Sequence, residues 1–209
     1  MASDDVSNEE LYPKKVREAR AVEMKFFEKM QVYERVPRSH AEETGGKVIG
    51  VRWVDVNKGD RTTTDYRSRL VGQEFATHKD DSLYASTPPL EALRMVLSYA
   101  ATVTKGGEKL SILIADVKRA YFYAMAKRNL YIELPAEDEN GDKGMLGQLR
   151  LNLYGTRDGA SNWQEHLVAH MVRIGFVRGT GHPSVFRSGS RTIDVSCSWR
   201  RLRVCRGCD

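Results

Sequence analysis

Several hallmarks of common protein classes are missing from this sequence of 209 residues. No apolar run approaches the roughly 18 residues that a membrane-spanning helix needs, and the opening residues MASDDVSNEE are acidic where a signal peptide is basic. The sequence has no glycine-rich phosphate-binding loop and no Gly-x-Ser-x-Gly nucleophile elbow. We therefore expect an intracellular protein that has no contact with a membrane and does not belong to the hydrolases or nucleoside triphosphatases marked by these motifs.

Cysteine is also scarce, and its distribution is uneven. All three cysteines lie in the final segment RTIDVSCSWRRLRVCRGCD, which has five arginines and no lysine. A structural zinc site takes four ligands, and only Cys197 and His182 are candidates to complete a site with Cys205 and Cys208. The sequence therefore does not predict zinc binding, although the composition marks 191–209 as unlike the rest of the chain.

The composition of the whole chain fits a folded protein with a core, because 41% of its residues are hydrophobic. A net charge of +5 is compatible with a nucleic-acid partner, but many other proteins are as basic. Helical spacing of apolar residues predicts an amphipathic helix that begins after Pro13 and two more helices, and alternating or apolar runs predict strands. The expected helices lie within 9–31, 88–104 and 159–176, and the expected strands within 47–75 (a hairpin), 110–116, 130–135, 147–156 and 182–188.

These elements are mixed without strict alternation, which favours an α+β fold over a doubly wound sheet. A loop is expected between the first helix and the hairpin, because Pro37 and the pair Gly45-Gly46 interrupt the pattern. On the last helix, His166 and His170 have the spacing of a metal-binding pair, but Leu167 stands where a metalloprotease has glutamate. Two exposed histidines on a polar helix face are therefore expected.

The run LSILIAD ends on Asp116, and two interpretations of this acid are open. It could cap the helical turn that follows, or it could serve as a metal ligand at the end of a buried strand. Arg67 and Arg69 are two residues apart in a strand and so share a face. That face is either a solvated edge or a binding surface for an anion.

Six motifs in this sequence resemble, in the same order, those of the reverse transcriptases of copia-type retrotransposons. ADVKRAYFYA is similar to the first catalytic motif, Asp-Val-Lys-x-Ala-Phe, and YRSRLVGQEF to Tyr-Lys-Ala-Arg-Leu-Val-x-x-Gly-Phe. LRLNLYGTRDGASNWQEHL resembles Leu-x-x-x-Leu-Tyr-Gly-Leu-Lys-Gln-Ala-Pro-Arg-x-Trp. GVRWVDVNKGD, LYIELP and GFVRGTGHPSVF complete the set, which covers roughly 15–187.

The resemblance implies a partial right-hand polymerase fold, with fingers from the hairpin and helices and an incomplete palm sheet that carries Asp116. It implies an RNA template, a DNA primer and deoxynucleoside triphosphates as partners, and Mg²⁺ bound by Asp116 and the carbonyl of Val117. Tyr121 takes the position of the ring that excludes a 2′-hydroxyl. The nucleotide-binding residues implied by the motifs are Arg67, Arg69, Val117, Ala120, Tyr121, Arg157 and Asp158.

Two departures from the family pattern bear on activity. The family's glutamine is Asp158 here, and a carboxylate repels a triphosphate. After PSVFRSGSRTI an Asp-Asp pair is due, but the chain continues with DVSCSWRRLRVCRGCD. One choice of codons for Ser198–Cys205 gives His-Gly-Asp-Asp-Tyr-Val-Ser when it is read one nucleotide further along. The hypothesis is therefore that the tail is an out-of-frame reading of the catalytic hairpin, and the alternative is a genuine basic C-terminal extension.

The expected organisation is a flexible acidic N-terminus over 1–14, a fingers and palm fragment over 15–190 and an aberrant tail over 191–209. The expected function is that of a truncated RNA-directed DNA polymerase that is inactive as written, because one aspartate cannot hold two Mg²⁺ ions. Two alternatives stay open: a nucleic-acid-binding remnant without enzymatic activity, and a degenerate open reading frame.

Overall fold

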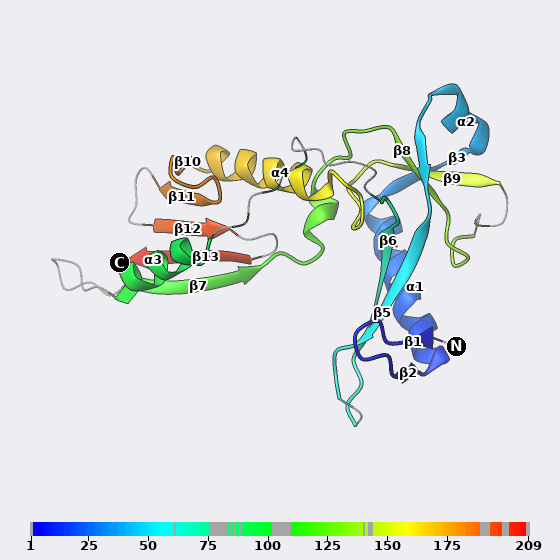
Figure 1. The fold of residues 1–209 in the computed structure, drawn as a ribbon, viewed down its shortest axis with the longest axis horizontal. Helices are drawn as coiled ribbons and strands as arrows, with labels where there is room; N and C mark the ends of the chain where they lie inside the picture. Colours follow the sequence, from blue (N-terminus) through cyan, green and yellow to red (C-terminus); the bar gives the residue numbers. More distant parts are fainter. Residues whose placement is uncertain are drawn as a thin grey trace. The chain divides into compact units, whose positions relative to one another are not determined.

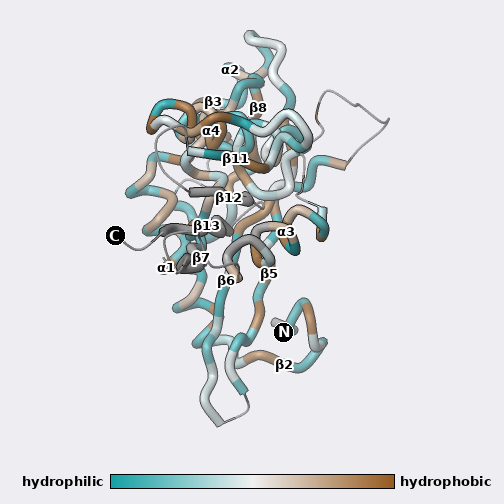
Figure 2. The backbone as a smooth tube through the Cα atoms, turned by 90° about the vertical axis from the view of Figure 1, so that its left-hand side faces the viewer, coloured by the Kyte–Doolittle hydropathy of each residue, from teal (hydrophilic) through white to brown (hydrophobic). Residues whose placement is uncertain are grey.

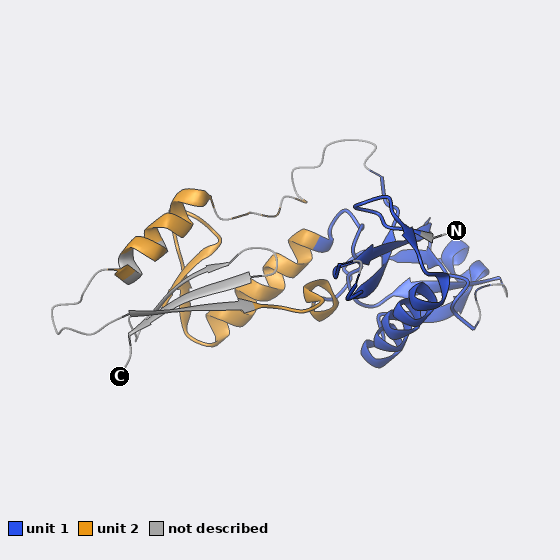
Figure 3. Cartoon of the chain, turned by 90° about the horizontal axis from the view of Figure 1, so that it is seen from below, with its two compact units in different colours: residues 1–79, 124–159 blue, residues 80–123, 160–209 orange. Residues whose placement is uncertain are grey.

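The computed structural model describes residues 2–60, 62–75, 83, 85, 87, 89–101, 110–139, 141, 144–188, 193–197 and 201–207. The chain forms two compact units (Figure 3). Unit 1 contains Met1–Lys79 and Ala124–Gly159, and unit 2 contains Asp80–Tyr123 and Ala160–Asp209. Both units combine helices with small sheets, so the α+β class is confirmed. Among the described residues, no helix is both long enough and apolar enough to cross a membrane.

The described part of unit 1 forms three small sheets and two helices (Figure 1). Its four-stranded sheet has the order β3-β9-β8-β4, in which β4 and β8 are parallel and the other pairs antiparallel. The pairs β1-β2 and β5-β6 form two-stranded antiparallel sheets. The elements are β1 Ala2–Ser3, β2 Glu10–Leu11, α1 Pro13–Met30, β3 Tyr33–Pro37, α2 Arg38–Glu43, β4 Lys47–Ile49, β5 Val51–Asn57, β6 Tyr66–Gly72, β8 Leu130–Glu133 and β9 Met145–Leu149.

Helix α1 follows the predicted amphipathic pattern. Pro13 occupies the first turn, where its missing N–H is not needed. Val16, Met24 and Phe27 are buried on the face that packs against β6. The helix ends at Gln31, whose left-handed backbone (φ 52°) turns the chain into β3. The expected first helix is therefore confirmed, including its start at the proline.

The predicted hairpin is confirmed for 51–72. β5 and β6 pair antiparallel with Val54 opposite Arg69, and their turn is hydrophilic (Figure 2). Ser68, Leu70 and Gly72 are buried while the residues between them are not, as the period of a strand requires. Lys47–Ile49 was expected to belong to this hairpin but pairs in parallel with β8 instead.

Unit 2 contains one antiparallel sheet of five strands in the order β10-β11-β12-β13-β7, with α3 packed against β7, β12 and β13. A buried cluster of Met171 and Phe186 joins α4 to β11. The elements are α3 Leu90–Ala101, β7 Leu110–Asp116, the 3-10 helix η2 Ala120–Tyr123, α4 Gly159–Arg173 (whose first residue belongs to unit 1), β10 Phe176–Arg178, β11 Val185–Ser188, β12 Ile193–Cys197 and β13 Arg201–Gly207. Gly175 ends α4 with a φ of 93°, as expected from the sequence.

Two segments of unit 1 have more structure than their sequence indicates. The acidic N-terminal segment, expected to be flexible, forms the β1-β2 pair, and Asp4 is 2% exposed. The segment after Pro37, expected to be a loop, contains α2, because Pro37 supplies an extended residue before the first turn. The Arg38 guanidinium also contacts Glu133 on β8 at 2.6 Å.

Candidate active site

Asp116 is the last residue of β7 and its side chain is exposed. The following 3-10 helix begins at Ala120, so the position directly before that helix is Arg119 and not Asp116. The interpretation of Asp116 as a helix cap is therefore not supported. On the neighbouring strand β13, the Cα partner of Asp116 is Arg201.

The turn after Asp116 is tightly folded. Arg119 has a left-handed backbone (φ 53°), which is uncommon for a residue with a side chain, and its carbonyl accepts a hydrogen bond from the Phe122 N–H at 3.0 Å. Ala120 is fully buried and Tyr121 is 7% exposed, while Tyr123 is 47% exposed. The Tyr121 ring, predicted to lie beneath a sugar, is thus largely covered by the protein itself.

The two candidate arginines of β6 differ in their surroundings. Arg67 is exposed and lies 3.7 Å from the Asp65 carboxylate, as expected for a solvated edge. Arg69 is half-buried, and its guanidinium lies over the ring of Tyr154 at 5.8 Å from the centroid. Of the two, Arg69 is therefore the one that is joined to the Leu-Tyr-Gly segment.

The Leu-Tyr-Gly segment lies directly against the end of β6. The Gly72 N–H donates to the Tyr154 carbonyl at 2.7 Å, and the Glu74 N–H donates to the Gly155 carbonyl at 3.3 Å. Gly155 has a φ of 85°, and a Cβ atom there would lie 2.0 Å from the Gly72 carbonyl oxygen. Glycine is required at 155 both for the backbone angle and for the close approach.

Glu74 is the centre of a cluster that sequence reasoning missed. Its side chain is completely buried, and its carboxylate accepts four hydrogen bonds. The donors are Lys47 Nζ at 3.1 Å, Arg128 Nη1 and Nη2 at 2.8 Å each, and the Arg157 N–H at 2.9 Å. The hydrogen bonds from Arg128 are the main reason why the pKa of Glu74 is lowered to about 2.

Asp158 belongs to the same cluster. Its carboxylate accepts a hydrogen bond from Arg128 Nη2 at 2.5 Å, and its side chain is 9% exposed. The charge that was expected to repel a triphosphate is thus paired with an arginine within the protein. One signal in the sequence could have revealed the cluster. Glu74 stands where the family motif has glycine, and Asp158 stands where it has glutamine. Both changes introduce a carboxylate, and a buried carboxylate needs a cationic partner.

The predicted site residues fall into two sets. Unit 1 brings Arg69, Arg157 and Asp158 together around Tyr154 and Glu74, with Arg67 further along β6. Unit 2 holds the second set close together in sequence, at the end of β7 and in η2: Asp116, Val117, Ala120 and Tyr121. Within the described part of the chain, no group of three or more His, Cys, Asp or Glu side chains is arranged to hold a metal ion.

The histidine pair of α4 is exposed, as predicted from the sequence. His166 stacks on the buried Trp163 with 5.9 Å between ring centroids, and its pKa is lowered by partial burial. His170 Nδ1 lies 3.0 Å from Arg173 Nη2.

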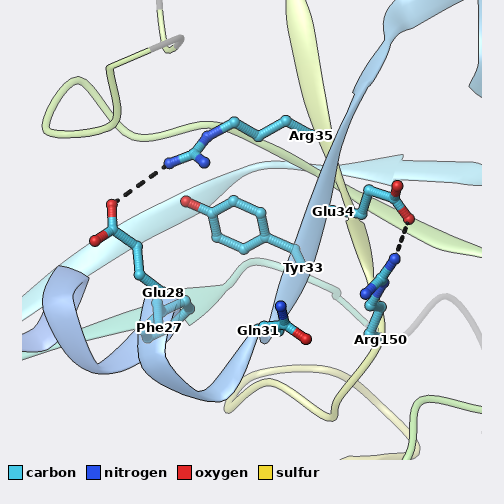
Figure 4. A pocket seen from close by; sticks show the side chains of 7 residues that line it. All are labelled: Phe27, Glu28, Gln31, Tyr33, Glu34, Arg35 and Arg150. Carbon is cyan, nitrogen blue, oxygen red and sulfur yellow. Dashed lines mark hydrogen bonds and ion pairs between the residues drawn. The ribbon is translucent and has the colours of Figure 1, made fainter.

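Unit 1 also has a pocket of about 330 Å³ between the end of α1 and β3 (Figure 4). Its charged residues form two ion pairs that flank Tyr33: Arg35 with Glu28 at 3.6 Å and Arg150 with Glu34 at 2.6 Å. None of the predicted site residues lines it. Because its charges are paired, the pocket offers no uncompensated charge to a phosphate.

Comparison with known proteins supports the resemblance seen in the motifs. The family model described as "Reverse transcriptase (RNA-dependent DNA polymerase)" matches residues 32–195. The chain is also similar to the Gag-Pol polyproteins of transposons Ty1-LR2, Ty1-ML2 and Ty1-ER1 of Saccharomyces cerevisiae, with 27% identity over 188 residues in each case. These matches cover 88% of the chain but only 10% of each polyprotein, so the chain spans about a tenth of the length of these relatives.

Proposed function

The chain belongs to the reverse transcriptase family, in its copia-type branch, and we propose that it is a fingers and palm segment descended from an RNA-directed DNA polymerase. The β5-β6 hairpin with α1 corresponds to fingers, and the sheet that ends in β7 corresponds to the palm of a right-hand fold. Its partners are an RNA template, a DNA primer and deoxynucleoside triphosphates. The match over 32–195 and the six ordered motifs support this proposal.

Each candidate residue has a role in this proposal that follows from its chemistry. Arg69 and Arg157 bind the triphosphate, since guanidinium groups match phosphate oxygens. Arg67, which is more exposed than Arg69, contacts the edge of the same triphosphate. Val117 contacts the incoming nucleotide through its backbone and Tyr121 excludes the 2′-hydroxyl, whereas the fully buried Ala120 packs within the protein. Asp158 stays in its ion pair with Arg128 and does not contact the triphosphate.

The residues present do not fit two Mg²⁺ ions. Asp116 and the Val117 carbonyl supply one side-chain ligand and one backbone ligand, while an octahedral Mg²⁺ takes about six oxygens. The Cα partner of Asp116 is Arg201, a cation. We therefore propose that the chain as encoded does not polymerise DNA, and the pairing of Arg201 with Asp116 is the observation that carries this conclusion.

Asp194 cannot replace the missing acids. It is opposite Cys205 on β13, and Cys205 is opposite Ile112 on β7. Ile112 precedes Asp116 by four residues, which corresponds to about 13 Å along the strand. Two ligands of one Mg²⁺ each lie about 2 Å from the ion, so Asp194 and Asp116 cannot share one.

The tail fits the proposal of a shifted reading frame. With the codons chosen above, the nucleotides of residues 200–202 encode Asp-Asp in the alternative frame, and the middle one of these residues, Arg201, is opposite Asp116. The hairpin of β12 and β13 is formed by the residues as written. A shift of one nucleotide would thus replace the Asp-Asp pair by arginines. The replacement lies where the family's palm hairpin carries its catalytic acids.

The test compares the encoded protein with a frame-restored variant in which His-Gly-Asp-Asp-Tyr-Val-Ser replaces the residues from Ser198. We expect the encoded protein to bind an RNA template annealed to a DNA primer in a salt-dependent manner but to leave the primer unextended. The restored variant extends it with deoxynucleotides, and D116N in that background does not. Primer extension by the encoded protein would contradict the proposal, as would a transcript without Asp-Asp in the neighbouring frame.

A further inference from the structure

The chain passes between the two units three times, at 79–80, 123–124 and 159–160. The charged cluster of unit 1 lies near all three crossings in the sequence. Glu74 precedes Lys79 by five residues, Arg128 follows Ala124 by four, and Asp158 directly precedes Gly159. The ion pairs of Arg128 with Glu74 and Asp158 thus connect three segments, each of which leads to the other unit.

The chemistry of this cluster favours one fixed arrangement. The Glu74 carboxylate uses both oxygens twice, so its four hydrogen bonds occupy its full capacity as an acceptor. Arg128 binds both Glu74 oxygens with two parallel N–H groups, a geometry that sets direction as well as distance. Loss of Arg128 would leave the buried Glu74 carboxylate without its paired guanidinium, which is strongly unfavourable.

Backbone hydrogen bonds connect the same three segments. The Glu74 N–H donates to the Gly155 carbonyl at 3.3 Å, and the Asn152 N–H donates to the Ala124 carbonyl at 2.9 Å. The Arg157 N–H is held by the Glu74 carboxylate, directly before α4 begins. Side-chain and backbone contacts therefore act on the same short stretches: 72–75, 124–128 and 152–159.

We propose that Glu74, Arg128 and Asp158 form a joint that holds the unit 1 ends of all three crossings together. Through this joint, Glu74 and Arg128 are positioning residues for Arg157. The connection to nucleotide binding rests on the proposed function, but the joint itself does not. Its contacts all lie within unit 1.

The test is native-state hydrogen exchange of the whole chain, which involves neither nucleotide nor nucleic acid. If the joint exists, the amides of the three stretches open together, with one common dependence on denaturant. E74Q removes the charge that receives four hydrogen bonds, and we expect exchange in all three stretches to accelerate by at least about tenfold. R128K keeps the charge but loses the paired geometry, so a smaller acceleration of the same three stretches is expected.

The matched control is E133Q, which breaks the exposed pair of Glu133 with Arg38 in the same unit. It should leave exchange at 72–75, 124–128 and 152–159 unchanged. The proposal is overturned if E74Q accelerates exchange only near residue 74, or if it accelerates exchange uniformly throughout unit 1. If E74Q does not fold, R128K and D158N decide: each must affect all three stretches together. A failure of primer-template binding would contradict the proposed function and leave these results unaffected.

Discussion

At the scale of single residues, Gly155 tolerates a side chain neither in its backbone angle nor in the space around it. Any other residue at this position would have to adopt a backbone φ of 85°, and its Cβ would lie 2.0 Å from the Gly72 carbonyl oxygen. We expect G155A to lower the free energy of unfolding of unit 1 by about 3 kcal/mol, because strain and a steric clash add. Urea denaturation measures this effect.

Gly45 provides the matched control for that substitution. It also has a positive φ, 61°, but a Cβ added there would meet no atom of the described residues within 4 Å. G45A should therefore lower the free energy of unfolding by only about 1 kcal/mol, the conformational cost alone. Equal losses for G45A and G155A would show that the close approach to Gly72 has no energetic weight.

Motifs in the sequence identify Arg69 and Asp116 as candidates, and the structure shows why other residues escape such reasoning. In the sequence, Glu74 is an ordinary polar residue that follows a strand. In the fold it is buried and accepts hydrogen bonds from Lys47, Arg128 and the Arg157 N–H, which come from distant segments. Nothing local in the sequence pairs Glu74 with Arg128, which is 54 residues away. Charge pairs of this kind depend on the tertiary fold and leave no periodic signal.

At the scale of elements, periodicity predicts α1, α3 and α4 because their apolar faces repeat over several turns. The pair β1-β2 has two residues in each strand and so cannot be stable by itself. It is attached to β5 by carboxylates: Asp4 Oδ2 accepts from the Asn57 N–H at 2.6 Å, and Asp5 Oδ2 from the Asp55 N–H at 2.8 Å. Such attachment could not be predicted from an acidic N-terminal composition.

This attachment gives a prediction for Asp4, which also accepts hydrogen bonds from the Val6 and Ser7 N–H groups. D4N replaces a charged acceptor by a neutral one whose amide donor has no acceptor among these three N–H groups. We expect faster exchange of the Asn57 amide and a loss of about 2 kcal/mol in the stability of unit 1. E10Q, at an exposed acid of the same segment, is the control and should change neither quantity.

At the scale of the whole molecule, the two units should respond differently to acid. Three carboxyl groups with a lowered pKa, those of Asp4, Asp60 and Glu74, lie in unit 1. The pKa of Glu74 is about 2 in the fold, against about 4.3 in an unfolded chain. Its contribution to stability is therefore complete above roughly pH 5 and is lost as the pH falls toward 2.

Amide signals resolved by unit make this measurable in urea titrations at pH 7, 5 and 3. We expect the unfolding midpoint of unit 1 to fall between pH 5 and pH 3 by more than that of unit 2. In E74Q the pH dependence of unit 1 should decrease, because the titrating group is gone. A pH dependence that E74Q leaves unchanged would assign the effect to other carboxylates.

The contact between Gly155 and Gly72 also has an evolutionary meaning, because it constrains its two partners unequally. The atom that excludes a side chain at 155 is the backbone carbonyl of 72, which every amino acid has. At 72, by contrast, a Cβ would meet Ile49 Cδ1 at 2.9 Å, the end of a flexible side chain that can move. Position 72 can therefore change from glycine to alanine at little cost, while mutation at 155 is removed by selection wherever this fold is needed.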